Sequence, residues 1–206
     1  CGMIGTTSQA ANQIALSLAS MTFMFAMGLS VTAMIRIGNQ KGLNDYVTLR
    51  KVAISIFLLT IIIEVVFALL FVLLHTSLPY IFVDINDAKN LTENLEVIAI
   101  SANLLLVAAV FQISDGLQVV VLGALRGLQD AKIPMYITFV AYWVIGFPIS
   151  IYLGLETELK AVGVWIGLLA GLTAAAIFLY IRFNYLTKKL VQVQTNPEAS
   201  GQVQLQ

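Results

Sequence analysis

Three polar side chains, Gln112, Asp115 and Gln118, stand three residues apart inside an apolar stretch that runs from residue 97 to residue 125. On a helix this spacing places them on one slowly rotating face. Asn103, just over three turns earlier, is expected near the same side. A bare carboxylate in hydrocarbon costs at least about 2.5 kcal/mol. Asp115 must therefore be protonated, paired or hydrated if the stretch crosses a bilayer.

Each of these states suits the exchange of one cation for another at Asp115. The side chain can release a proton when a sodium ion or a cationic substrate arrives, and so report which cation is bound. If the two loaded forms favour opposite-facing conformations, a cation gradient can drive efflux. The alternative is structural, with a protonated Asp115 hydrogen-bonded across helices. We expect cation coupling at Asp115, with Gln112 and Gln118 assisting and sodium as a possible ligand.

A second acid, Glu64, lies near the middle of the apolar stretch at residues 52–74. Ionisable residues inside a membrane are costly, which makes each one a functional candidate. The residues three and four positions away on its own helix form no polar cluster. Two roles stay open for Glu64: a functional acid, and a protonated structural group bonded to another helix. We expect Glu64→Gln to weaken transport less than Asp115→Asn, because Asp115 has the polar stripe.

The elements that position these acids follow from the composition. With 59% hydrophobic and 11% charged residues, and a mean hydropathy of +0.91, the chain has more apolar surface than a soluble domain can bury. The apolar stretches cover residues 10–35, 52–74, 97–125, 133–153 and 161–181. Each reaches the roughly 20 residues that a membrane-spanning helix needs, and none alternates as barrel strands do. The sequence predicts an all-α integral membrane protein with five transmembrane helices.

Two features predict how the last helices pack. Gly163, Gly167 and Gly171 recur at spacings of four, so that they form a smooth strip on which another helix can approach closely. Pro148 lacks the amide hydrogen that a helix interior needs, and we expect it to bend the fourth helix.

Charge predicts the orientation. The net charge is zero, which gives no support for a nucleic-acid partner. One side of the membrane would hold nine basic residues: Arg36, Lys41, Arg50, Lys51, Arg126, Lys132, Arg182, Lys188 and Lys189. Only Lys89 and Lys160 would lie on the other side, so the first side is predicted to be cytoplasmic. The carboxyl terminus then lies inside, with residues 187–206 as a polar, disordered tail, and residue 1 lies outside, so that we expect at least one helix to precede it.

Motifs for enzymatic chemistry are absent from the sequence. It has no phosphate-binding loop, no HExxH pair and no nucleophile elbow. The lone Cys1 excludes an internal disulfide and any multi-cysteine metal site. We expect no enzyme and no cofactor, although a membrane enzyme that uses Asp115 or Glu64 as an acid or base is an alternative.

Several motifs occur in an order that resembles the multidrug and toxic compound extrusion (MATE) transporters. Asp-Gly-Leu-Gln at 115–118, Gly-Ala-Leu-Arg-Gly at 123–127 and Pro134 are similar to that family's tenth helix and the loop after it. The eleventh and twelfth helices are matched by residues 141–148 and 161–165, and the eighth by residues 12–15 and 36–38. The resemblance spans about residues 8–186.

This resemblance implies that residues 1–186 form most of a carboxyl-terminal lobe of the NorM-like branch. Such a lobe is a bundle of six helices, of which the first, helix seven, and the whole amino-terminal lobe would be missing here. Members of the family export organic cations, drugs and other xenobiotics by alternating access, driven by inward flow of sodium or protons, and the bacterial plasma membrane is the expected location. Asp115 matches an acid that the family associates with cation binding, whose usual carboxylate partner lies on helix seven.

Two residues depart from the family pattern. Asn12 stands where many relatives have His, and Phe111 stands where many have Tyr, so that one possible cation ligand, the tyrosine hydroxyl, is lost. A lipid or oligosaccharide flippase of the wider superfamily is a further alternative. It would need a broad basic cavity, whereas Glu64 and Asp115 are acidic.

Overall fold

The computed structural model describes residues 6–83, 91–157 and 160–195, and these form an all-helical bundle, as the sequence predicts. The helices are α1 (Thr6–Gly42), α2 (Tyr46–Leu74), the 3₁₀ turn η1 (Leu78–Ile81), α3 (Leu91–Gly127), α4 (Lys132–Val140), the π-helical turn η2 (Ala141–Gly146), α5 (Phe147–Leu155) and α6 (Lys160–Thr195). Within the described residues, five helical segments are long and apolar enough to cross a membrane, with α4, η2 and α5 forming one of them.

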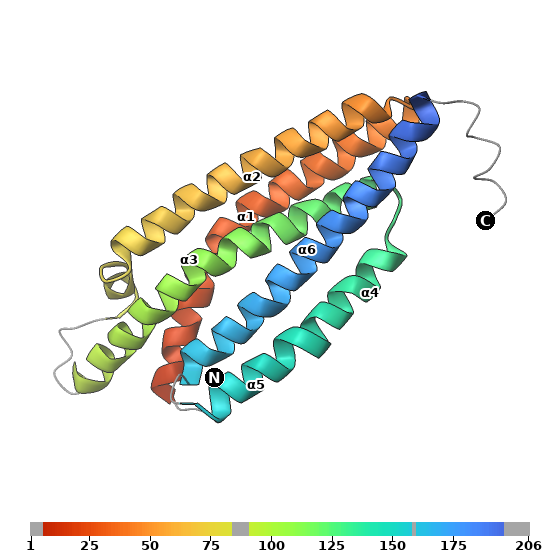
Figure 1. The fold of residues 1–206 in the computed structure, drawn as a ribbon. Helices are drawn as coiled ribbons and strands as arrows, with labels where there is room; N and C mark the ends of the chain where they lie inside the picture. The colour runs from red at the N-terminus through yellow and green to blue at the C-terminus, as the bar shows by residue number, and fades with distance from the viewer. Residues whose placement is uncertain (1–5, 84–90, 158–159, 196–206) are drawn as a thin grey trace.

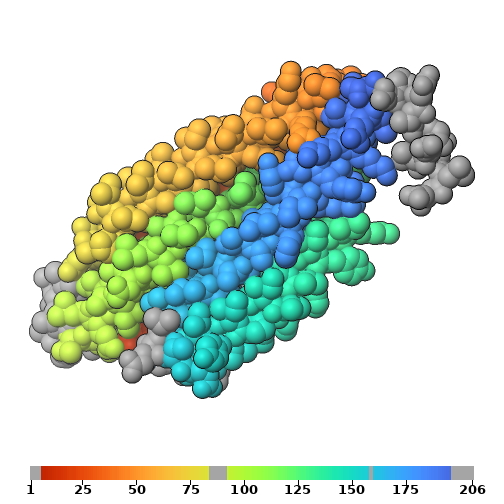
Figure 2. Space-filling view, viewed as in Figure 1, coloured from red at the N-terminus to blue at the C-terminus, as the bar shows by residue number. Residues whose placement is uncertain are grey.

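Helix α3 holds the bundle together. It packs against α1, α2 and α6, while α6 also packs against the segment formed by α4, η2 and α5 (Figure 1). In Figure 2, α2, α3, α6 and the α4–α5 segment cross the visible face as successive ridges. A residue on α3 can therefore face three different neighbours, depending on its position around the helix.

The buried apolar side chains form two clusters, one toward each end of the bundle. The first includes Ala68 and Ala109, and the second includes Phe57 and Val120. On α2 and α3 the residues between these clusters are the ones that carry Glu64, Gln112, Asp115 and Gln118. The polar side chains thus occupy a level of their own in mid-bundle, which we call the polar layer.

The bundle has a basic end, where Gly42, Gly127 and Thr195 lie. There Lys41 Nζ donates to the Leu128 carbonyl at 2.8 Å, and Arg182 Nε donates to Asp130 Oδ2 at 2.9 Å. Such contacts satisfy helix ends and hold neighbouring helices in register. The turn into α2 is closed by Asp45, which accepts a hydrogen bond from the Thr48 amide at 3.0 Å. Hydrogen bonds from Thr48 lower the pKa of Asp45 below its ordinary value.

The helices extend beyond the predicted apolar stretches. Helix α6 continues to Thr195, so residues 187–195, which we expected in a disordered tail, are helical. Residues 196–206 of that tail lie outside the described residues. The difference arises because hydropathy marks only the part of a helix that lies in hydrocarbon, whereas good helix formers such as Lys188, Lys189 and Leu190 continue the helix beyond it.

The fourth span is irregular where Pro148 was expected to bend it. The π-helical turn η2 ends two residues before Pro148, and the Phe147 amide donates to the Tyr142 carbonyl, five residues back. Proline has no amide hydrogen and cannot continue the regular pattern of bonds four residues apart. The wider turn accommodates this loss, and it includes Tyr142, which reaches the polar layer.

Helix α6 approaches the fourth span closely at its glycines. A Cβ atom added to Gly171 would lie 2.9 Å from the Cα of Gly146, and one added to Gly167 would collide with the backbone of Ser150. A Cβ atom added to Gly163 would likewise collide with the backbone of Leu153. The three glycines therefore let two backbones touch, which strengthens the van der Waals packing that helps helices to associate in lipid.

We expect Gly167→Ala to destabilise the whole protein by about 1–3 kcal/mol, because the methyl group overpacks the contact with Ser150. Gly28→Ala is the matched control, since a Cβ at Gly28 has no neighbour within 4 Å. Thermal unfolding of the detergent-purified variants should show a lower midpoint for Gly167→Ala alone. Equal midpoints for the two variants would mean that the contact contributes nothing.

Candidate functional site

The three amino acids that the sequence singles out on α3 all lie in the polar layer. Gln112 and Gln118 are nearly fully buried, with 4% and 7% of their surfaces exposed, while Asp115 is half-buried. The spacing of three residues turns them toward different neighbours. Gln112 faces α2, and Gln118 faces the turn η2.

Glu64 is brought against α3 by the packing of α2. Only 1% of its surface is exposed, and its side chain lies directly over Gly116: a Cβ at Gly116 would be 2.8 Å from the Glu64 Cγ and Oε1 atoms. The Gln112 Nε2 atom donates a long hydrogen bond of 3.4 Å to the backbone carbonyl of Glu64. The polar neighbours that Glu64 lacks on its own helix are thus supplied by α3.

A small cavity joins the two acids. Its volume is about 10 Å³, close to the least space that a water molecule needs. Its walls come from α1, α2 and α3: Ala19, Thr22, Phe23, Glu64, Phe111, Gln112, Asp115 and Gly116. Glu64 and Asp115 therefore border the same enclosed space.

Two buried oxygen atoms at this cavity lack a hydrogen-bond partner among the residues that the structure describes: Glu64 Oε2 and Gln112 Oε1. A buried acceptor without a donor typically costs about 1–3 kcal/mol. Each can be satisfied by a proton donor or by a small cation, because hard cations take oxygen ligands. The arrangement is suited to receiving positive charge.

On the other flank of α3, two hydrogen bonds connect the polar layer to later helices. The Tyr142 hydroxyl donates to Gln118 Oε1 at 2.6 Å, and the hydroxyls of Ser114 and Thr173 are 3.0 Å apart. Our sequence reasoning did not select Tyr142, Ser114 or Thr173 as site residues. The signal was available for each of them, namely a hydroxyl inside an otherwise apolar span.

Asn103 does not share the face of Asp115, contrary to our expectation. Its side chain is exposed, and twelve residues of α-helix rotate it about 120° away from Asp115. The expectation was wrong because twelve residues make three full turns and a further third of a turn, which puts Asn103 on a different face of the helix.

A groove beside the polar layer is lined by Asn12 and Phe111, the two residues that we expected to depart from the family pattern. The Trp165 Nε1 atom donates to Asn12 Oδ1 at 2.9 Å, and the rings of Phe111 and Trp165 lie 5.2 Å apart. The groove has a volume of about 360 Å³ between α1, α3 and α6. Phe111 also borders the small cavity, so it lines both spaces.

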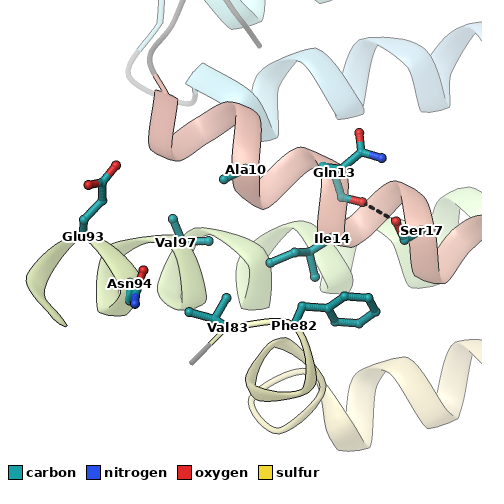
Figure 3. Close-up of a pocket in the computed structure, with 9 residues that line it drawn as sticks. All are labelled: Ala10, Gln13, Ile14, Ser17, Phe82, Val83, Glu93, Asn94 and Val97. Atoms are coloured by element: carbon teal, nitrogen blue, oxygen red, sulfur yellow. Dashed lines mark hydrogen bonds between the residues drawn. The ribbon is translucent and has the colours of Figure 1, made fainter. Parts of the chain in front are cut away.

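A larger pocket of about 460 Å³ lies at the end of the bundle opposite the basic end (Figure 3). It is formed by the start of α1, the residues after η1 and the start of α3. Its labelled side chains include Gln13, Phe82 and Glu93, and the Ser17 hydroxyl donates to the Gln13 carbonyl at 2.8 Å. The acid, the two amides and the aromatic ring that line this pocket do not form a catalytic constellation.

The chemistry available in the polar layer is that of oxygen ligands. Among the described residues, no three His, Cys, Asp or Glu side chains gather closely enough to hold a metal ion. Carboxyl, amide and hydroxyl oxygens in this layer favour protons and hard monovalent cations over transition metals.

Comparison with known proteins gives consistent results. A family model described as MatE matches residues 1–152. The probable multidrug resistance protein NorM of Rhodopseudomonas palustris is 41% identical over 182 residues, which are 88% of this chain and 37% of that protein. The multidrug resistance protein NorM of Burkholderia vietnamiensis is 36% identical over 190 residues, which are 92% of this chain and 40% of that protein. The chain therefore spans about two fifths of the length of these relatives.

Solved structures share the fold. The eukaryotic MATE transporter AtDTX14 superposes with a TM-score of 0.76 at 19% identity, covering 89% of this chain and 40% of that one. An inward-facing multidrug resistance MATE family transporter of the MOP superfamily gives 0.74 at 16% identity, covering 86% and 39% of the two chains. With the family match over residues 1–152 and the identity to NorM proteins, these findings establish that this chain belongs to the MatE family of multidrug and toxic compound extrusion transporters.

Proposed function

We propose that the whole protein is a sodium- or proton-coupled antiporter that exports organic cations and other xenobiotics. The observation that carries this proposal is the position of Asp115, a half-buried acid at mid-bundle that makes no ion pair with any described residue. A lone carboxylate there needs a proton or a cation. Membership of the MatE family, whose members are transporters, excludes the enzyme that the acids alone left open.

Residues 6–195 supply one part of the transporter in this proposal, most of its carboxyl-terminal lobe. The first helix of the lobe and the whole other lobe would come from the rest of the protein, as the coverage of the relatives suggests. Gln118 and Tyr142 would orient the polar layer, and Gln112 would connect Asp115 to α2. Loading of Asp115 with a proton or sodium ion would favour one orientation of the transporter, and loading with substrate the other.

Organic cations are the substrate class that suits this arrangement. The polar layer offers acids and no basic side chain among its described members, and aromatic rings line the adjoining groove. Acids and rings attract cations, whereas an anionic lipid or oligosaccharide headgroup would need basic residues. The relatives named as multidrug resistance proteins favour the same choice over a flippase.

We also propose that the protein lies in a bacterial plasma membrane with its basic end in the cytoplasm. The bacterial NorM relatives support the location. The structure brings Lys41, Arg182 and their partners to one end of the bundle, and basic residues are retained on the cytoplasmic side.

Asp115→Asn in the whole protein should abolish ion-driven export, because the amide cannot exchange a proton for a cation. Dye efflux from proteoliposomes, with sodium and proton gradients imposed separately, should fall at least about 10-fold in the variant under the gradient that drives the wild type.

Glu96→Gln provides the control for that experiment, since Glu96 is an exposed acid on the same helix and outside the polar layer. It should leave efflux unchanged. Efflux that persists undiminished in Asp115→Asn would return Asp115 to a structural role.

The proposed orientation predicts the accessibility of two exposed positions at opposite ends of the bundle. In an otherwise cysteine-free whole protein, Glu156→Cys should react with a membrane-impermeant maleimide in intact cells. Lys189→Cys should react only after the membrane is opened. The reverse pattern would overturn the assignment of the basic end to the cytoplasm.

A further inference from the structure

We propose that Glu64 on α2 is a second carboxyl of the cation site, and that Glu64 and Asp115 share one monovalent cation, a proton or a sodium ion, with Gln112 as a neutral ligand. The inference rests on the proposed function. The inference adds to the proposed cation site a ligand from α2, a helix on which the sequence alone shows no polar cluster.

The first support is the shared cavity. Glu64 and Asp115 come from different helices, yet both border the same space of about 10 Å³. Two carboxylates so close to one enclosed space repel each other, so one proton or one cation between them is favoured over two negative charges. The space suits one small cation that has lost most of its water.

The second support is independent of the acids' position. Glu64 Oε2 and Gln112 Oε1, on side chains that are 99% and 96% buried, both lack a donor among the described residues. Buried acceptors are normally satisfied. Here the amide nitrogen of Gln112, a residue that lines the cavity, donates to the Glu64 backbone carbonyl, and the amide oxygen has no described partner. A cation would satisfy both oxygen atoms at once.

The third support is the glycine beside Asp115. Any side chain at Gly116 would collide with Glu64, because a Cβ atom there lies 2.8 Å from Cγ and 2.9 Å from Cδ of that residue. The absence of a side chain at Gly116 is what lets the Glu64 carboxyl group reach the level of Asp115. The Thr22 hydroxyl borders the same cavity from α1, but it donates its hydrogen to the Ala19 carbonyl at 2.9 Å and so is not a donor to Glu64.

No described basic side chain competes for this pair of acids. The walls from α1 are Ala19, Thr22 and Phe23, and α3 contributes Asp115 as its titratable group at the cavity. From the turn η2, Tyr142 faces α3 and donates its hydroxyl to Gln118. The positive charge that balances the acids must therefore be mobile, or come from the part of the protein beyond the described residues.

The test is a double-mutant cycle on the purified whole protein, with direct cation binding as the readout. Sodium ions are titrated at several pH values, and infrared difference spectra record the loss of protonated carboxyl groups. The variants are Glu64→Gln, Asp115→Asn and the double variant, with Glu96→Gln as the control. Dye efflux is measured separately on the same proteins.

If the two acids share one cation, Glu64→Gln should raise the sodium concentration for half-maximal response about 10-fold, or, for a proton site, shift the pH midpoint of the Asp115 signal by about one unit. The double variant should be no worse than Asp115→Asn alone, because the shared ligand is already lost. Glu96→Gln should match the wild type.

Two results would overturn the inference: midpoints for Glu64→Gln within twofold of the wild type, or losses that simply multiply in the double variant. Either can occur while Asp115→Asn still strongly weakens binding and efflux, which would leave the proposed function standing. A wild-type protein that shows neither sodium nor proton dependence would refute both.

Gly116→Ala keeps the test decisive if Glu64→Gln does not fold. The added methyl group displaces the Glu64 carboxyl group without removing its charge, and Gly28→Ala controls for the gain in helix propensity. Weaker cation binding in Gly116→Ala alone supports the shared site, and unchanged binding contradicts it.

Discussion

The structure depends on one constraint: two carboxyl groups lie at the middle of a bundle whose surroundings are lipid and apolar side chains. Glu64 is almost fully buried and Asp115 half-buried, between two apolar clusters that close the bundle above and below them. Such groups are tolerated only when protons, cations or hydrogen bonds compensate them. The amides of Gln112 and Gln118 and the hydroxyl of Tyr142 provide hydrogen-bonding groups around the acids.

Close backbone packing is what makes this polar layer possible. Gly116 admits the Glu64 side chain, and the contact of Gly171 with Gly146 draws α6 against the turn η2. The π-helical turn before Pro148 includes the tyrosine that binds Gln118. Small residues and a break in regular helix geometry thus bring polar groups from separate helices to one level. The glycines and the π-helical turn both lower the local stability of the helices, as expected near functional sites.

The sequence was sufficient for the fold class and for the five spans, because long apolar runs leave few structures other than helices in a membrane. It also drew attention to Asp115, since an acid flanked by two amides at helical spacing is conspicuous in such a run, and the role of Asp115 stays a prediction. It could not pair Glu64 with α3, because which face of α2 meets which face of α3 depends on packing around Gly116, a contact distant in sequence. The helices are longer than the sequence predicted, because hydropathy reports contact with lipid and not helix length. The same property is why hydropathy found the five spans.

The central claim is that the acids of the polar layer exchange a proton or a sodium ion for an organic cation. The most direct measurement is the release of protons and of bound sodium that follows addition of tetraphenylphosphonium to the purified whole protein in weakly buffered solution. The account predicts release in the wild type and none in Asp115→Asn. Equal release from both proteins, or tight binding of the cation by the wild type with no release of protons or of bound sodium, would contradict it.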